Sequence, residues 1–168
     1  MKIALLTFVL PFLTLAAETK KAGTACGIEV MVPGNWTVTE AAQLKAPVCF
    51  EMTALQEVSV AVLKSSESKL SCADFLKNMD ESRKKKNVLA SDKQKMSEAQ
   101  VKNAKADQGA LGEYEIQEAK MKFAVKQKSY CLKNGNETRV LLATFQKNKG
   151  AQYEPLISEI FTTFKFTK

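Results

Sequence analysis

The sequence contains no histidine among its 168 residues. Histidine is the commonest general base at neutral pH and a frequent metal ligand. Its absence argues against histidine-dependent hydrolases and histidine-ligated metal sites. Glu113 and Glu115 would share one face of a strand, but a solvated surface pair explains them. Gly109-x-x-Gly112 has neither the lysine nor the spacing of a phosphate-binding loop. We therefore expect no catalytic residue, no cofactor and no metal site.

Arginine is nearly absent as well. Arg83 and Arg139 are the only arginines in a chain with 25 basic and 18 acidic residues and a formal net charge of +7. The planar arginine fork suits phosphates and guanine edges, whereas lysine is a hydrated point charge common on soluble surfaces. The excess of lysine therefore predicts a solvated basic surface, and we expect no nucleic-acid partner.

Long apolar runs are missing apart from one at the start of the chain. Lys2 is followed by an apolar stretch from Ile3 to Leu15 and then by the small residues Ala16 and Ala17. This stretch is shorter than the roughly 20 residues that span a bilayer, and it is typical of a signal peptide. We expect residues 1–17 to be removed on export to the periplasm or the extracellular space. A flexible lead-in at 18–25 would then precede one domain at 26–168.

The chain has four cysteines, Cys26, Cys49, Cys72 and Cys131. An even number of cysteines in an exported protein favours disulfide bonds, and no two of them have the spacing of a thiol redox motif. Three pairings are possible, and the sequence does not choose among them. Cys26–Cys49 with Cys72–Cys131 closes the smallest total loop, so we slightly prefer it. Free buried thiols are the alternative.

Apolar residues that alternate along the chain predict several strands. Ile28, Val30 and Val32 share one face of a strand that would open the sheet, and Pro33-Gly34-Asn35 turns the chain before the single tryptophan, Trp36. The same period recurs at residues 48–52 and 58–63, which predicts a hairpin. Its second strand is apolar on both faces, which places it near the middle of a sheet. Later strands are predicted at 113–116, 121–132 and 140–145, with Asn134-Gly135 in a tight turn between the last two.

A helical period predicts two helices. The first spans about 71–86: Ser71 and Asp74 form a capping pattern, and an apolar stripe contains Cys72, Phe75, Leu76 and Met79. The second spans about 153–162, with Pro155 in its first turn and Tyr153, Leu156, Ile157, Ile160 and Phe161 on one face. Residues 163–166 alternate again and can form a short closing strand.

Residues 87–108 are ambiguous. Ser97-Glu98-Ala99-Gln100 can cap a helix, whereas Val101, Asn103 and Lys105 can alternate in an edge strand, and we favour the strand. Gly109 and Gly112 are expected to flank a turn or bulge. Together the patterns predict one α+β domain, in which a mostly antiparallel sheet of six to seven strands is packed by two helices.

In this layout the sequence resembles the PsbP-like family, which includes bacterial periplasmic DcrB-type proteins and Mog-type Ran-binding factors. The matching features are Pro33 and Trp36 after the opening strand, the hairpin at 48–63, the first helix at 71–86, and Phe164 after the last helix. The resemblance implies an antiparallel sheet with helices on its faces, and an accessory or binding protein without a catalytic site. The histidine metal ligands of some photosynthetic members have no counterpart here, so neither that cofactor role nor Ran binding transfers to any residue.

Two basic clusters are candidate binding sites for an anionic partner. Lys122, Lys126 and Lys128 have the same strand parity as Tyr130, so they predict a basic stripe beside an aromatic ring. Residues 83–86 form the second cluster, Arg83, Lys84, Lys85 and Lys86, which also complements the helix dipole. Solvated surface lysines are the alternative explanation for both clusters.

Two sequons, at Asn35 and Asn136, lie in predicted turns and matter only in a glycosylating host. Our leading hypothesis is a non-catalytic exported accessory protein, expected to be a monomer, that binds another protein or an envelope component through one sheet face. A basic surface protein that contacts an anionic membrane or polymer is the second hypothesis. The third is a carrier of a small apolar ligand in a cavity lined by residues such as Phe50, Met79, Met121 and Phe161.

Overall fold

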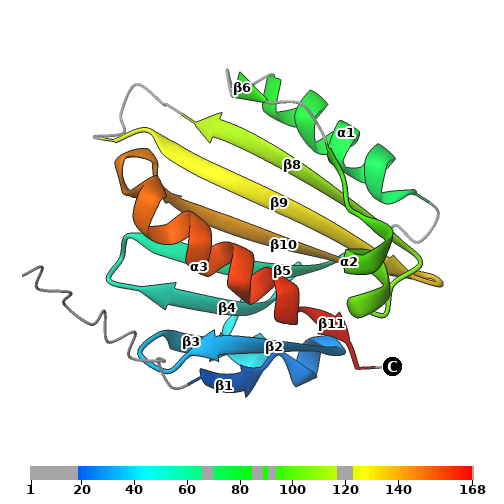
Figure 1. Cartoon of the computed structure of the whole chain (residues 1–168), viewed down its shortest axis with the longest axis horizontal. Helices are drawn as coiled ribbons and strands as arrows, with labels where there is room; N and C mark the ends of the chain where they lie inside the picture. The colour runs from blue at the N-terminus through cyan, green and yellow to red at the C-terminus, as the bar shows by residue number, and fades with distance from the viewer. Residues whose placement is uncertain (1–18, 66–69, 85–88, 91–93, 117–122, 168) are drawn as a thin grey trace, which may run out of the picture.

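The computed structural model describes residues 19–65, 70–84, 89–90, 94–116 and 123–167. Its main element is an antiparallel sheet of six long strands in the order β3-β4-β5-β10-β9-β8, with the short strands β6 and β7 paired to β8 (Figure 1). The strand bounds are β3 Thr37–Glu40, β4 Val48–Ala54, β5 Val58–Ser65, β6 Leu89–Ala90, β7 Gln94–Lys95, β8 Gln108–Ile116, β9 Val125–Asn134 and β10 Glu137–Gln146.

A second, three-stranded sheet in the order β1-β2-β11 packs beside the main sheet. Its strands are β1 Thr19–Ala22, β2 Ile28–Pro33 and β11 Lys165–Phe166. Ile28, Val30 and Val32 are fully buried, as their alternation predicts. Two expectations were wrong here. The predicted flexible lead-in contains β1, and the opening strand β2 belongs to this small sheet rather than to the main one.

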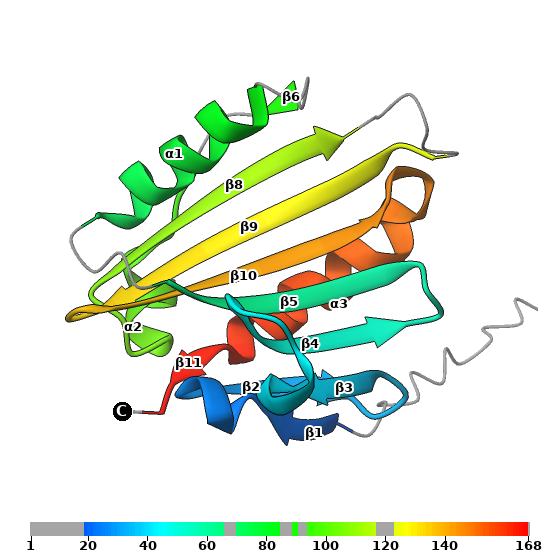
Figure 2. The same ribbon diagram turned by 180° about the vertical axis from the view of Figure 1, so that it is seen from behind.

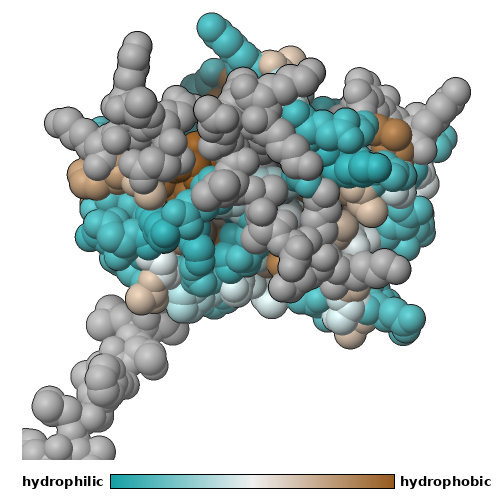
Figure 3. Space-filling view, turned by 90° about the horizontal axis from the view of Figure 1, so that it is seen from above, coloured by the Kyte–Doolittle hydropathy of each residue, from teal (hydrophilic) through white to brown (hydrophobic). Residues whose placement is uncertain are grey.

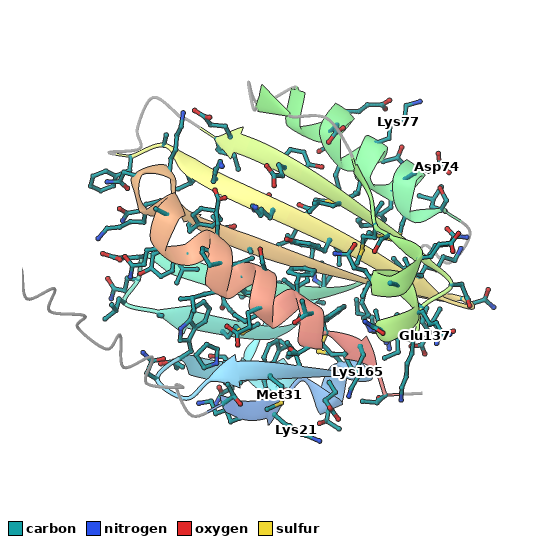
Figure 4. All side chains as sticks on the ribbon, in the orientation of Figure 1. Lys21, Met31, Asp74, Lys77, Glu137 and Lys165 are labelled. Atoms are coloured by element: carbon teal, nitrogen blue, oxygen red, sulfur yellow. A yellow bond between two sulfur atoms is a disulfide. The ribbon has the colours of Figure 1, made fainter. Side chains whose placement is uncertain are left out.

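Two main helices lie on opposite faces of the main sheet (Figures 1 and 2). Helix α3, Gly150–Thr163, covers the front face together with the small sheet, and its buried residues Tyr153, Ile157, Ile160 and Phe161 belong to the larger core. Helix α1, Cys72–Lys84, packs on β8 and β9 at the back, where Leu76 belongs to a second core. Asp74 and Lys77 of α1 point away from the sheet (Figure 4). The predicted α+β architecture is confirmed.

Short helices connect these elements. The bounds are η1 Thr24–Cys26, η2 Ala41–Gln43, α2 Glu98–Asn103 and η3 Lys147–Lys149. The strand favoured for this part of the ambiguous region was wrong, because α2 forms there. The Ser97 side chain accepts a hydrogen bond from the Gln100 amide at 3.3 Å, and the Gln100 side chain accepts one from the Ser97 amide at 2.9 Å. This reciprocal capping box satisfies amide groups that a short helix otherwise leaves open.

The expected turn at Gly109 and Gly112 was also wrong, since both glycines lie inside β8. A Cβ at Gly109 would lie 2.7 Å from the Met96 sulfur, and one at Gly112 would lie 2.7 Å from the Tyr114 hydroxyl. Glycine at these two positions therefore leaves room for the side chains of Met96 and Tyr114. Strand β9 begins at Val125, four residues later than predicted. In the β9–β10 turn, Gly135 (φ 53°) and Asn136 lie between the paired residues Asn134 and Glu137.

Candidate interaction surface

Both preferred disulfides are present. Cys26–Cys49 joins η1, which connects β1 to β2, to strand β4, with 5.8 Å between the two Cα atoms, and Cys72–Cys131 joins α1 to β9, with 5.4 Å. Cys26, Cys72 and Cys131 are each at most 2% exposed. The two bonds therefore hold layers of the fold together.

Part of the back face of the main sheet is not covered by any described helix. Helix α1 lies over β8 and β9, and Figure 2 shows no α-helix over the adjoining strands β10 and β5, while η2 contacts β4. We call this area the open face and define it as Glu51, Thr53, Ser59, Ala61, Gln127, Leu142 and Thr144, all of them half-buried. Seen from above, over α1, the described surface is mainly hydrophilic, with only scattered hydrophobic atoms (Figure 3).

Strand register sets the chemistry of the open face. Thr53 lies opposite Ser59, Ser59 opposite Thr144, and Thr144 opposite Gln127, so one polar row crosses four strands. The Gln127 amide donates to the Thr144 hydroxyl at 2.9 Å, and the Ser59 hydroxyl donates to Glu51 at 2.8 Å. Among the seven residues Glu51 is the only one with a charge. A flat face of small hydroxyl, amide and aliphatic groups is unusual in a chain of which 26% is charged.

A pocket of about 380 Å³ lies at the end of this face, where the β4–β5 turn meets the beginning of β9. Thr53, Ser59 and Thr144 of the open face form part of its lining, and Gln56, Val125 and Phe123 form another part. Among the described residues, two large apolar side chains are exposed: Phe123 at 51% and Leu55, beside Gln56 in the turn, at 81%. The open face therefore ends in an apolar edge.

Charged side chains at this end are paired. The Tyr153 hydroxyl donates to Glu57 at 2.7 Å, and this hydrogen bond is the main cause of a lowered pKa for Glu57. The same bond, with burial, raises the pKa of Tyr153 to about 12. Lys149 lies 3.6 Å from Glu57, and Lys147 lies 2.6 Å from Glu115. These pairs fasten the start of α3 to the tip of the sheet.

Lys126, Lys128 and Tyr130 of the predicted basic stripe share one strand face as expected, but Lys128 and Tyr130 are buried. Lys128 and Tyr130 are only 9% and 8% exposed, because α3 covers them. Lys128 lies 3.0 Å from Glu113 and 3.7 Å from Glu154, Lys126 lies 2.6 Å from Glu154, and Tyr130 stacks on Phe161. Burial, with the two carboxylates, raises the pKa of Tyr130 to about 12. Both described lysines of the stripe are thus paired with carboxylates, and binding of an anionic partner at this stripe stays a prediction.

The other predicted site residues lie elsewhere. Lys122, Lys85 and Lys86 fall outside the described residues, as does the proposed signal peptide, and the structure describes only the backbone of Arg83 and Lys84. Phe50 and Phe161 belong to the front core and Met79 packs on the back core, while Met121 is not described. The carrier hypothesis requires these residues to line one cavity, but Phe50 and Phe161 lie in a different core from Met79.

Two further pockets lie around α2, one of about 610 Å³ between the start of α1, α2 and β8, and one of about 210 Å³ between α2 and α3. Within the described ranges, no three histidine, cysteine or acidic side chains are close enough to hold a metal ion. In the same part of the chain, no helix is both long and apolar enough to cross a membrane.

No family model matches the sequence, and no curated protein matches it. Solved structures do match. The cyanobacterial PsbP protein CyanoP from Synechocystis superposes with a TM-score of 0.61 at 11% identity, covering 89% of this chain and 93% of that one. The chain has the PsbP-like fold.

Two other structures share this PsbP-like fold. The Ran-binding protein Mog1p from Saccharomyces cerevisiae gives a TM-score of 0.58 at 10% identity, covering 91% of this chain and 97% of its own. The protein PA94 of unknown function from Pseudomonas aeruginosa gives 0.53 at 10% identity, covering 86% and 94%. The predicted resemblance is therefore confirmed for the fold. Its signature residues are structural: Pro33 ends β2, and Trp36 and Phe164 are 3% and 1% exposed.

Proposed function

We propose that this protein is a non-catalytic, exported accessory protein that binds another protein through its open face. The observation that supports this most directly is the composition of that face, which has one charged residue in seven and ends at the exposed side chains of Phe123 and Leu55. Contact surfaces that exclude water are poor in charged residues and rich in aromatic ones. A protein partner with an uncharged surface complements this composition.

The other observations agree with this proposal. Two disulfides are typical of proteins in oxidising compartments, which fits export by the proposed signal peptide. The chain lacks histidine, the commonest general base at neutral pH. The ion pairs around Lys128 hold α3 to the sheet, so these charged residues have a structural role. In the described part of the stripe, Lys126 and Lys128 are paired with carboxylates, which weakens their attraction for an anionic partner. We therefore favour a protein partner over an anionic polymer.

The test places a charge on the open face. Ala61 lies between Glu51 and Leu142 in the strand register, so Ala61→Arg adds bulk and charge there without removing a side-chain hydrogen bond. Ala151→Arg, at an exposed position of α3, is the matched control. Each full-length chain is expressed in its native host with a C-terminal tag. Strand β11, the last described strand, lies at the other end of the molecule from the β4–β5 turn (Figure 1).

Proteins retained by each tagged chain are captured at moderate salt and quantified by mass spectrometry, and urea unfolding checks that the variants fold. We expect Ala61→Arg to reduce retention of the wild-type partner at least tenfold and Ala151→Arg to leave it unchanged. Equal retention by the wild type and a folded Ala61→Arg chain would rule out the open face as the binding surface.

A further inference from the structure

The β4–β5 turn has a backbone that its residues do not favour. Leu55 and Gln56 have φ angles of 52° and 56°, and the Glu57 amide donates to the Ala54 carbonyl at 3.1 Å. A turn with two consecutive left-handed residues prefers asparagine and glycine, because a branched side chain crowds the backbone there. The β9–β10 turn of this protein does place a glycine, Gly135, at its left-handed position.

The Leu55 side chain contributes little to the stability of the fold. Its side chain is 81% exposed, so it contributes almost no buried apolar surface. Its backbone conformation therefore opposes stability, and burial of its side chain does not compensate for this. Conformations of this kind persist where a residue serves a function other than folding. Gln56, the next residue along the chain, lines the 380 Å³ pocket together with Phe123, which is 51% exposed.

The charges around this tip indicate the kind of surface it meets. Three lysines at this end are each paired with a carboxylate: Lys126 with Glu154, Lys147 with Glu115, and Lys149 with Glu57. Attachment to anionic lipid depends on accessible cations, and pairing weakens the attraction of these three. Within the described part of this tip, the apolar side chains thus lie among paired charges, which is complementary to an uncharged apolar pocket in a protein.

We infer that Leu55 is the anchor of the interface: it inserts into an uncharged apolar pocket of the protein partner, and Phe123 packs against the rim of that pocket. This inference rests on the proposed function, because it places Leu55 at the edge of the open face. It further specifies which residue provides most of the affinity and what chemistry the partner must offer.

The test distinguishes the effect of the turn's backbone conformation from the effect of the Leu55 side chain. Leu55→Asn provides a residue that tolerates the left-handed conformation and removes the apolar side chain. Gln56→Gly relaxes the adjacent position and keeps Leu55, so it is the matched control. We expect both variants to have an unchanged or higher urea midpoint than the wild type. Leu55→Asn should reduce capture of the partner at least tenfold, whereas Gln56→Gly should capture it normally.

Full retention by Leu55→Asn overturns the anchor. If Ala61→Arg still loses the partner in that case, the open face stands and only the role of Leu55 is wrong. If both variants retain it, the proposed function fails as well. The wild-type chain is also mixed with phosphatidylcholine vesicles, with and without phosphatidylserine. Binding to either kind of vesicle that Leu55→Asn abolishes would show that the tip inserts into lipid, and would overturn the inference of a protein pocket.

Discussion

Glu154 of α3 accepts a hydrogen bond from Lys126 of β9 at 2.6 Å, and its other carboxylate oxygen lies 3.7 Å from Lys128 of the same strand. One carboxylate therefore joins the helix to two neighbouring positions of the sheet. The bond to Lys126 is the main reason that the pKa of Glu154 lies below its ordinary value of 4.5, and the same bond raises the pKa of Lys126. The helix that covers the larger core is thus held partly by charge.

This arrangement predicts a loss of stability in acid. Because the folded protein lowers the pKa of Glu154, the carboxylate stabilises the fold above the unfolded pKa, near 4.5, and this contribution is lost as the pH falls through the lower folded value. Glu57 has a lowered pKa for a similar reason and acts in the same direction. Urea unfolding between pH 3 and 7 should show a fall in stability below about pH 4.5 that is larger in the wild type than in Glu154→Gln.

Glu159→Gln, on an exposed position of the same helix, is the control and should follow the wild type. If Glu154→Gln and the wild type lose stability in parallel over this pH range, the ion pair does not couple protonation to folding. The magnitude will be modest, because about a third of each of the Lys126 and Glu154 side chains is exposed and water screens the pair.

The sequence predicts the elements whose pattern reflects a single buried face. Ile28, Val30 and Val32 alternate because β2 packs one face on the core, and α3 has a helical stripe because Ile157 and Ile160 pack on the same core. The β1 strand has no such pattern. Its lysines are exposed, and it forms because its backbone pairs with β2, which side-chain periodicity cannot reveal.

The capping signal of α2 was visible in the sequence, but a helix of six residues is too short to show a helical period, so the competing strand pattern was favoured. The basic stripe shows a different limit. The parity of Lys126, Lys128 and Tyr130 was correct, but it does not say which face a distant helix covers. Glu154, 28 residues after Lys126, pairs with Lys126 and Lys128 and holds α3 over this face.

The candidate site itself was missed. Thr53, Ser59 and Thr144 look like ordinary strand residues, and only the register of four strands brings them into one row. One signal was available. Leu55 is an apolar residue inside the short link between two predicted strands, a position where glycine or asparagine is expected.

The two disulfides should differ in their effect on stability. Cross-links that close longer loops restrict the unfolded chain more, and the separations are 59 residues for Cys72–Cys131 and 23 for Cys26–Cys49. Removing the first bond by a double alanine substitution should lower the free energy of unfolding by about 4 kcal/mol, and removing the second by about 3 kcal/mol. Urea unfolding of both double variants measures this order. The reverse order would mean that native packing around Cys26 matters more than the length of the loop.

Arg139 makes a second, non-covalent connection between the two sheets, close to the Cys26–Cys49 bond. The Arg139 side chain is 3% exposed; its Nε donates to the Cys26 carbonyl at 2.7 Å, and one Nη donates to Glu137 at 2.8 Å. Its guanidinium also lies 5.9 Å from the centre of the Phe166 ring in β11. The arginine thus satisfies a carbonyl group that would otherwise be buried without a partner.

Replacing Arg139 with leucine should lower the free energy of unfolding by about 1–3 kcal/mol or more, because the Cys26 carbonyl loses its hydrogen bond inside the protein. The control is Glu137→Gln, which removes the ion pair and leaves the carbonyl contact in place. Since the Glu137 side chain is 53% exposed, this change should cost less than about 1 kcal/mol. Urea unfolding of both variants distinguishes the two contributions. Equal losses would show that Arg139 acts through its charge, whereas a large loss confined to Arg139→Leu would show that it holds the sheets together through the buried carbonyl.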